Sequence, residues 1–157
     1  EIGVVVFGDG PLVDPTIVDR AIDLYLAMPY YDFVGNDLKT TYPPGMEVEV
    51  FSIRALSESA ERCKSLIIRE HGTLYLRTHP DVFRLYNFEA EKSLQRTDLA
   101  LEVDTLEDFR VIQIILEHFG DRVSFSLQEI IEFVDSAGDL AEVNKHIPRR
   151  WQQYRRT

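Results

Sequence analysis

The sequence has few of the features that mark secreted, membrane or disulfide-stabilised proteins. Its 157 residues include one cysteine, Cys63, so no disulfide can form within the chain. No run of apolar residues approaches the roughly 20 that are needed to span a bilayer, and no segment resembles a secretory signal. We therefore predict a cytoplasmic protein that does not associate with membranes.

Positive charge is also scarce. The chain has 17 lysines and arginines against 27 aspartates and glutamates, which gives a net charge of −10. Such a charge repels phosphate backbones, so we expect no nonspecific binding of nucleic acid. Residues 145–157 are the exception, because they hold five basic side chains and no acidic one. This basic tail is either solvated or covers an acidic neighbour.

The composition is that of an ordinary globular domain. Hydrophobic residues make up 45% of the chain, and neither an internal repeat nor a low-complexity linker occurs. We place one α/β domain at residues 1–144 and the basic C-terminal tail at residues 145–157. The sequence starts without methionine inside an apolar run, from which we expect that a further segment precedes it in the native gene product.

The beginning of the chain has the pattern of a strand, a loop and a helix. Residues 2–7 are apolar and β-branched and are followed by Gly8-Asp9-Gly10-Pro11, as in a fully buried parallel strand that ends in a loop. Asp14 can cap the next helix, and Pro15 suits its first position. This unit is the elementary piece of a doubly wound sheet.

Strands and helices are expected to alternate through the rest of the chain. Short strands are predicted at residues 32–34, 82–88 and 99–103, and the alternation at residues 47–51 predicts a half-buried strand, preceded by a loop at residues 36–45. Helices are predicted from Ser52 to about Cys63, over residues 66–78 up to His79-Pro80, from Thr105 to Gly120 with Phe109, Ile112, Ile115, Leu116 and Phe119 on its apolar face, and from the capping box at Ser126 to Ala137.

Two aspartates stand where predicted strands end. Asp9 follows residues 2–7 and Asp104 follows residues 99–103. Ligands of open α/β sheets bind at the carboxyl ends of strands, and paired carboxylates suit Mg²⁺. For either residue alone a structural role is the better interpretation, since Asp9-Gly10 is a common turn and Asp104-Thr105 can cap a helix. For the two aspartates taken together, a metal site and a structural role are both open interpretations.

Other charged residues give a weaker signal. Arg69 can meet a carboxylate or phosphate, and His71 can hydrogen-bond a sugar hydroxyl or transfer a proton. A surface ion pair and an ordinary helix histidine are the simpler interpretation. Glu47 and Glu49 share one strand face, so one can reach a pocket, while both can equally be solvated.

Four segments together resemble a known family. They are residues 8–15 (GDGPLVDP), 42–52 (YPPGMEVEVFS), 69–73 (REHGT) and 102–109 (EVDTLEDF). The same motifs occur in this order and with similar spacing in spore-coat-polysaccharide-type cytidylyltransferases. These enzymes are similar to the synthetases that attach CMP to sugar acids such as 3-deoxy-manno-octulosonate and acylneuraminate. The resemblance covers nearly the whole chain up to about Asn144.

The resemblance implies a fold, a reaction and a set of site residues. The fold is a Rossmann-like nucleotide-diphospho-sugar transferase domain with a mixed sheet, here lacking its first βα unit. Asp9 and Asp104, in the GDxP and VDTxED motifs, would hold Mg²⁺. A sugar oxygen would attack the α-phosphate of CTP and pyrophosphate would leave. The side chains that would line the sugar side are those of Glu47, Glu49, Arg69 and His71.

Several alternatives follow from what the chain does not share with the family. The glycine-rich loop that cradles CTP in the family is not in the sequence, so we expect the isolated chain to be inactive and its exposed sheet edge to drive self-association. Glu47 and Ala100 also differ from the residues common in the family. A noncatalytic sugar-binding or interaction module and a glycosyltransferase of the same fold therefore remain open.

Overall fold

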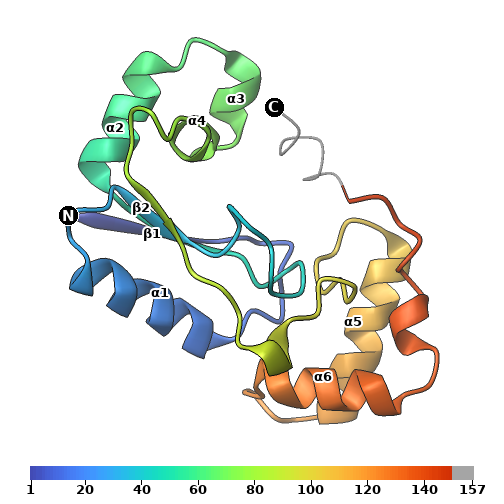
Figure 1. The fold of residues 1–157 in the computed structure, drawn as a ribbon. Helices are drawn as coiled ribbons and strands as arrows, with labels where there is room; N and C mark the ends of the chain where they lie inside the picture. The colour runs from blue at the N-terminus through green and yellow to red at the C-terminus, as the bar shows by residue number, and fades with distance from the viewer. Residues whose placement is uncertain (150–157) are drawn as a thin grey trace.

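The computed structural model describes residues 1–149 and has at its centre a mixed four-stranded sheet (Figure 1). The strands are β1 (Ile2–Val6), β2 (Phe33–Gly35), β3 (Val48–Ser52) and β4 (Leu85–Asn87), in the order β1-β3-β2-β4. Strand β3 runs antiparallel to β1 and β2, and β2 runs parallel to β4. The predicted α/β class with a mixed sheet is confirmed. The carboxyl ends of β1, β2 and β4 lie at the same end of the sheet.

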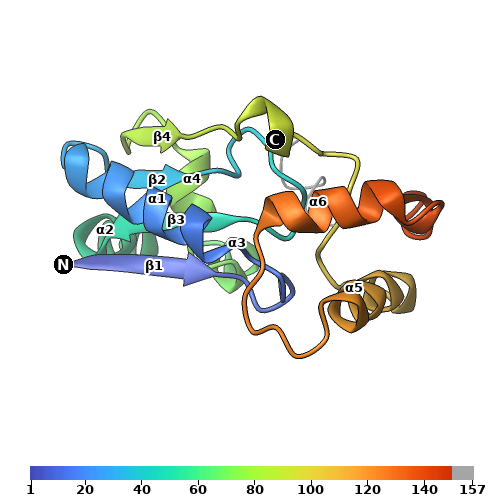
Figure 2. The same ribbon diagram turned by 90° about the horizontal axis from the view of Figure 1, so that it is seen from below.

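Helices cover both faces of this sheet. They are α1 (Pro15–Ala27), α2 (Ile53–Arg62), α3 (Leu66–Glu70), α4 (Leu74–Thr78), α5 (Leu106–Phe119) and α6 (Leu127–Ser136), with short 3₁₀ turns η1 (Lys92–Leu94) and η2 (Leu140–Glu142). Figure 1 shows α1 on one face and α2 to α4 on the other. Helices α5 and α6 lie beyond the end of the sheet to which β1 points (Figure 2).

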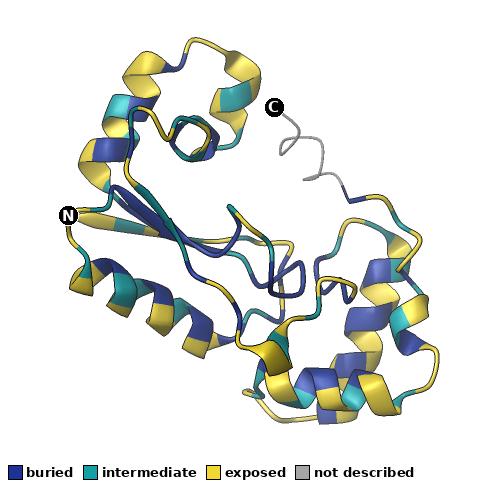
Figure 3. Cartoon of the chain, viewed as in Figure 1, coloured by how far each residue is buried: buried dark blue, intermediate teal, exposed yellow. Residues whose placement is uncertain are grey.

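Two apolar cores lie on opposite faces of the sheet. Val34, Val48 and Val50 belong to a large core with residues of α1, α5 and α6. Phe33 and Phe51 belong to a smaller core with residues of α2 and α4. The buried residues accordingly form the inner sides of the helices (Figure 3). Strand β3 is therefore buried on both faces, which corrects the half-buried strand that the alternation predicted.

Strand β1 differs from the prediction of a fully buried parallel strand. It pairs antiparallel with β3 at the edge of the sheet, and Ile2, Val4 and Val6 are 40%, 40% and 43% exposed. The cause is the position of α1, which packs on β3 and β2. Val4 pairs with the buried Val50 but lies beyond the cover of the helix.

The predicted helix caps are confirmed. The Asp14 carboxylate accepts the Thr16 N–H at 2.8 Å, and its other oxygen accepts the Leu127 N–H at 2.8 Å, so this buried residue also joins α1 to α6. The Ser52 hydroxyl caps α2. The capping boxes of α5 and α6 are present, and α5 ends at Gly120 with a positive φ.

Residues 66–78 form two short helices and not one. Helix α3 ends at His71, and α4 begins after Thr73, with the Leu74 N–H donating to the His71 carbonyl at 2.6 Å. Gly72 and Thr73 are poor helix formers. The Thr73 hydroxyl donates to the buried Glu49 at 2.6 Å, so a contact distant in sequence fixes the break.

Residues 99–102 are buried and Val103 is half-buried, but residues 99–103 do not form the predicted strand. The Leu101 N–H donates to the Pro44 carbonyl at 2.7 Å, and the Val103 N–H donates to the Asp9 carbonyl at 2.8 Å. The segment therefore bonds to two loops, and no strand within residues 1–149 pairs with it.

The predicted apolar face of α5 is partly wrong. Phe109 and Leu116 are 52% and 46% exposed, whereas Val111, Ile112 and Ile115 are buried. Residues three and four apart share a helix face, and the buried face here is centred on Ile112 and Ile115.

No helix within residues 1–149 is long and apolar enough to cross a membrane. Of the predicted basic tail, Arg150, Arg155 and Arg156 lie outside the described residues.

Candidate functional site

Three loops meet at the end of the sheet where β1 ends and β3 begins. They are residues 7–11, residues 43–46 and residues 99–104. A Cβ atom on Gly10 would lie 2.5 Å from the Gly45 carbonyl oxygen, and one on Gly45 would lie 2.5 Å from the Leu101 carbonyl carbon. Gly45 also has φ of +101°, a conformation that other residues rarely adopt. Both glycines therefore permit the backbones to approach.

The two predicted metal ligands lie on the outer loops of this junction. The bond from the Val103 N–H to the Asp9 carbonyl places the backbone before Asp104 directly beside Asp9. Both aspartates are exposed. Their side chains accept no hydrogen bond from the part of the chain that the structure describes, residues 1–149. The arrangement leaves both carboxylates available to a ligand.

The chemistry of this pair fits Mg²⁺. Carboxylate oxygens are the donors that Mg²⁺ prefers, and the ion usually keeps several waters while one or two protein carboxylates and substrate phosphates complete its shell. Among residues 1–149 no group of three or more His, Cys, Asp or Glu side chains could hold a metal ion. A metal site at Asp9 and Asp104 would therefore have few protein ligands, which suits an ion that is shared with a phosphate substrate.

Glu47 supports the central loop. Its side chain is half-buried, and its Oε2 atom accepts the N–H of Gly45 at 2.7 Å. This bond stabilises the backbone at the glycine that contacts Leu101. Glu47 thus links the start of β3 to the loop junction.

Glu49 is fully buried and lies on the other side of β3 from α1. It accepts the Thr73 hydroxyl at 2.6 Å and pairs with the Arg77 guanidinium at 3.0 Å, both from the region of α4. Burial raises the pKa of Glu49 to about 7, the Thr73 hydrogen bond acts to lower it, and the nearby Glu47 raises it further. Arg77 also pairs with a second carboxylate, Asp37, so its charge is shared between the two.

Arg69 and His71 lie on α3 and at its end. The Arg69 guanidinium donates to the carbonyls of Ala60 at 2.5 Å and Cys63 at 3.3 Å, so it joins α3 to the last turn of α2. His71 is the half-buried C-cap of α3, and its N–H donates to the Ile68 carbonyl at 3.1 Å. These contacts are structural, and the predicted contacts of both residues with a sugar stay predictions.

Sequence reasoning missed the buried ion pair of Asp37 with Arg77. Asp37 follows β2 at the same sheet edge as Asp9, and its Oδ1 atom is buried without a hydrogen-bond partner within residues 1–149. The loop composition concealed it, because Asn and Asp there are also typical of turns. Its position two residues after a strand was the available signal.

A second buried polar cluster was also missed. Asp108, with no exposed surface, contacts Asn144 and Arg149 as well as the backbone of Asp104. Burial acts to raise the pKa of Asp108, but hydrogen bonds from Arg149, Thr105 and Asn144 outweigh it and hold the pKa below its usual range. The sequence showed Asp108 only as a favourable charge in the first turn of α5.

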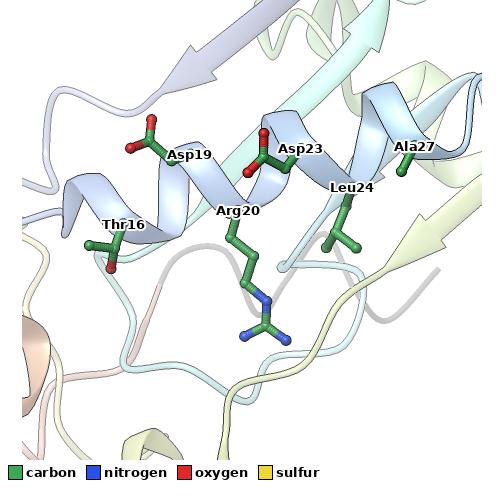
Figure 4. A pocket seen from close by; sticks show the side chains of 6 residues that line it. All are labelled: Thr16, Asp19, Arg20, Asp23, Leu24 and Ala27. Carbon is green, nitrogen blue, oxygen red and sulfur yellow. The ribbon is translucent and has the colours of Figure 1, made fainter.

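A shallow hollow on the outer side of α1 contains none of these residues. It is lined by Thr16, Asp19, Arg20, Asp23, Leu24 and Ala27 (Figure 4). Arg20 donates to the Tyr42 hydroxyl at 3.1 Å and so belongs to the packing of α1 against the loop before β3. The loop junction, not this hollow, unites the residues singled out in the sequence.

Comparisons with known proteins agree with the resemblance found in the sequence. No protein-family model matches the chain. The uncharacterized protein MJ1063 of Methanocaldococcus jannaschii is 28% identical over 148 residues, which are 94% of this chain and 58% of that protein. The spore coat polysaccharide biosynthesis protein SpsF of Bacillus subtilis is 30% identical over 137 residues, which are 85% of this chain and 55% of SpsF.

The fold agrees with a solved structure of the same kind. A cytidylyltransferase from Leptospira borgpetersenii superposes with a TM-score of 0.85 at 26% identity, over 95% of this chain and 61% of that one. The chain thus spans between 55% and 61% of the lengths of these relatives. Over the length that it spans, the chain is similar to the spore coat polysaccharide biosynthesis protein SpsF and to the Leptospira cytidylyltransferase, and it has the Rossmann-like fold of that enzyme.

Proposed function

We propose that this chain supplies the metal- and sugar-binding part of a cytidylyltransferase site, which transfers CMP from CTP to a sugar or sugar acid and releases pyrophosphate. The observation that carries the proposal is the loop junction, where the Val103 N–H donates to the Asp9 carbonyl. This bond brings together two exposed aspartates from motifs that lie far apart in the sequence. The relationship to SpsF and to the Leptospira cytidylyltransferase supports the same reaction class.

Asp9 and Asp104 are the residues that would hold Mg²⁺. When bound, the ion would neutralise charge on the phosphates of CTP and align them, which is the main requirement of transfers at phosphorus. The chain itself is strongly acidic, with a net charge of −10. Without a metal ion, its carboxylates would repel the triphosphate.

The sugar side would be formed from the β3 and α3 region. Glu47 is half-buried at the junction and is placed to support the loop that a substrate would contact. Glu49 is fully buried, so we assign it to the positioning of Thr73 and Arg77 and not to direct contact. Arg69 and His71, at the end of α3, complete the proposed set.

We further propose that the chain alone does not turn over CTP. The 157 residues contain no glycine-rich loop with Arg and Lys of the kind that holds CTP in the related enzymes. Backbone N–H groups and cations of such a loop are the usual means of binding a triphosphate.

Calorimetry of CTP binding in the presence of Mg²⁺ tests the proposal, on this chain and on the full product of its gene. We expect the full product to bind CTP and to release pyrophosphate with some member of a panel of sugars and sugar acids. Asp104→Asn in the full product should abolish this turnover. A full product that neither binds CTP nor releases pyrophosphate would contradict the assignment.

A noncatalytic sugar-binding or interaction module is the second candidate. The observation that favours it is the engagement of Arg69 with the carbonyls of α2, which leaves this side chain with a structural role. Binding of a sugar acid without turnover of CTP by the full product would select this alternative. A glycosyltransferase would instead release a nucleotide and form a glycosidic bond, so product analysis separates the third candidate.

A further inference from the structure

The loop that carries Asp104 is held by one oxygen of a buried carboxylate. Asp108 Oδ2 accepts the Asp104 N–H at 3.1 Å, the Thr105 N–H at 2.9 Å and the Thr105 hydroxyl at 2.9 Å. Asp108 has no exposed surface. The backbone on which Asp104 stands is therefore fixed by a side chain that no solvent reaches.

The other oxygen of Asp108 is held by a segment near the end of the described chain. Asp108 Oδ1 accepts hydrogen bonds from Asn144 Nδ2 at 2.8 Å and from Arg149 Nη1 at 2.9 Å. These donors lie 36 and 41 residues further along the chain. The Asp108 carboxylate thus connects the Asp104 loop to residues 144–149.

Residues 144–149 also contact the strand-like segment that precedes Asp104. Asn144 Nδ2 donates to the Ala100 carbonyl at 3.1 Å, and Arg149 Nη1 lies 3.6 Å from Glu102 Oε1. Arg149 Nη2 returns to the Asn144 carbonyl at 3.1 Å. The same segment therefore fixes the chain on both sides of Val103, whose N–H binds the Asp9 carbonyl.

Burial makes these contacts strong and mutually dependent. The side chains of Arg149 and Asp108 are 7% and 0% exposed. A buried carboxylate that loses its cation remains as an uncompensated charge, which is far more costly than the loss of a surface pair. Loss of Arg149 would therefore leave the Asp108 carboxylate buried without its cation and without one of the hydrogen bonds that hold it in place.

Helix α6 shows that a capping box does not itself need a buried cation. Its box has the same local geometry, with the Ser126 N–H donating to Glu129 Oε2 at 2.9 Å. The cation there is Arg122, 2.8 Å from Glu129, and the two side chains are 51% and 38% exposed. The buried cation occurs at α5, the helix whose leading loop carries Asp104.

We propose that Arg149 and Asn144 are positioning residues for Asp104. They fix the loop that carries Asp104, so that the Asp104 carboxylate can bind a divalent metal ion together with Asp9. Both would act through Asp108 and the backbone around Asp104, and not by contact with the metal ion or the substrate. The inference rests on the proposed role of Asp104 in metal binding, and it adds residues 144–149 to the parts of the chain on which that role depends.

The test uses Arg149→Met and Arg149→Lys in this chain, with Mn²⁺ as the probe metal. Mn²⁺ affinity is measured by paramagnetic resonance, and hydrogen exchange is measured at the Asp104 and Thr105 amides. We expect Arg149→Met to accelerate exchange at these amides and to weaken Mn²⁺ binding, each by about tenfold. Arg149→Lys, which keeps the charge, should recover part of both effects and also serves if the Met variant does not fold.

Arg122→Met is the matched control, because it removes the cation beside the α6 capping box. It should leave Mn²⁺ affinity and the Asp104 amide unchanged. If the Arg149 variants bind Mn²⁺ as the unmodified chain does while Asp104→Asn does not bind it, the inference is wrong and the metal site stands. If Asp104→Asn also binds Mn²⁺ normally, both the metal site and the inference are overturned.

Discussion

Glu49 and Asp108 are buried carboxylates with opposite electrostatic surroundings. Burial is the main influence on Glu49 and raises its pKa to about 7, although the Thr73 hydroxyl donates a hydrogen bond that acts to lower it. Asp108 has Arg149 and several donors of its own, and its pKa is lowered. The number of donors that each carboxylate receives, more than its depth, decides which form the fold prefers.

Glu49 predicts a specific pH dependence of stability. Its pKa rises from 4.5 to about 7 on folding, so the fold favours the protonated form. The stabilisation is complete below pH 4.5 and is lost as the pH rises through about 7. Glu49→Gln, which stays neutral, should therefore match the unmodified chain near pH 5 and exceed its free energy of unfolding near pH 8 by about 1 to 2 kcal/mol.

Urea unfolding at the two pH values measures this difference. Glu58→Gln is the matched control, since Glu58 pairs on the surface with Arg54 and Arg62. Its effect should be small at both pH values. An equal effect of Glu49→Gln at pH 5 and pH 8 would show that Glu49 does not titrate in this range.

At the scale of elements, local signals were predicted well and distant pairings were not. The caps at Asp14, Ser52 and Ser126 depend on residues two or three positions away, and the sequence displays them directly. The segment 99–103 bonds to Pro44 and Asp9, which are far away in the sequence. Its apolar pattern indicates burial but not the partner, so the strand prediction was wrong.

The candidate site shows the same division. The position of Asp9 after a strand was visible in the sequence, and so was the turn signal at Gly45. The ion pair of Arg149 with Asp108 joins residues 41 positions apart. The sequence offered a solvated tail or a tail that covers an acidic neighbour, but it did not identify Asp108 as that neighbour. Only the fold brings such residues together.

The loop junction predicts a strong effect of one added methyl group. Gly45→Ala places a Cβ atom 2.5 Å from the Leu101 carbonyl carbon in a backbone with φ of +101°. We expect a loss on the order of 3 kcal/mol in the free energy of unfolding. Gly72→Ala, where a Cβ meets nothing within 4 Å, is the control and should change stability little. Similar unfolding curves for both variants would contradict this account of the junction.

At the scale of the molecule, β1 leaves apolar surface uncovered at the edge of the sheet. Ile2, Val4 and Val6 are each at least 40% exposed in a row along one face. Exposed edge strands with apolar side chains tend to pair with another chain. The expected self-association of this chain follows from this surface and stays a prediction.

Sedimentation velocity tests it. We expect the chain to form a dimer or larger species in the micromolar range, and Val4→Lys to shift it to the monomer. Val123→Lys is the control, because Val123 is 101% exposed but lies outside β1. A chain that is monomeric at every concentration would rule out association through this edge.

The central claim is that Asp9 and Asp104 act together on one divalent metal ion. Mn²⁺ binding, measured by paramagnetic resonance for Asp9→Asn, Asp104→Asn and the double variant, tests it most directly. The account predicts that each single variant loses the site and that the double variant loses nothing more, because both carboxylates serve one ion. Full Mn²⁺ affinity in either single variant would contradict the claim.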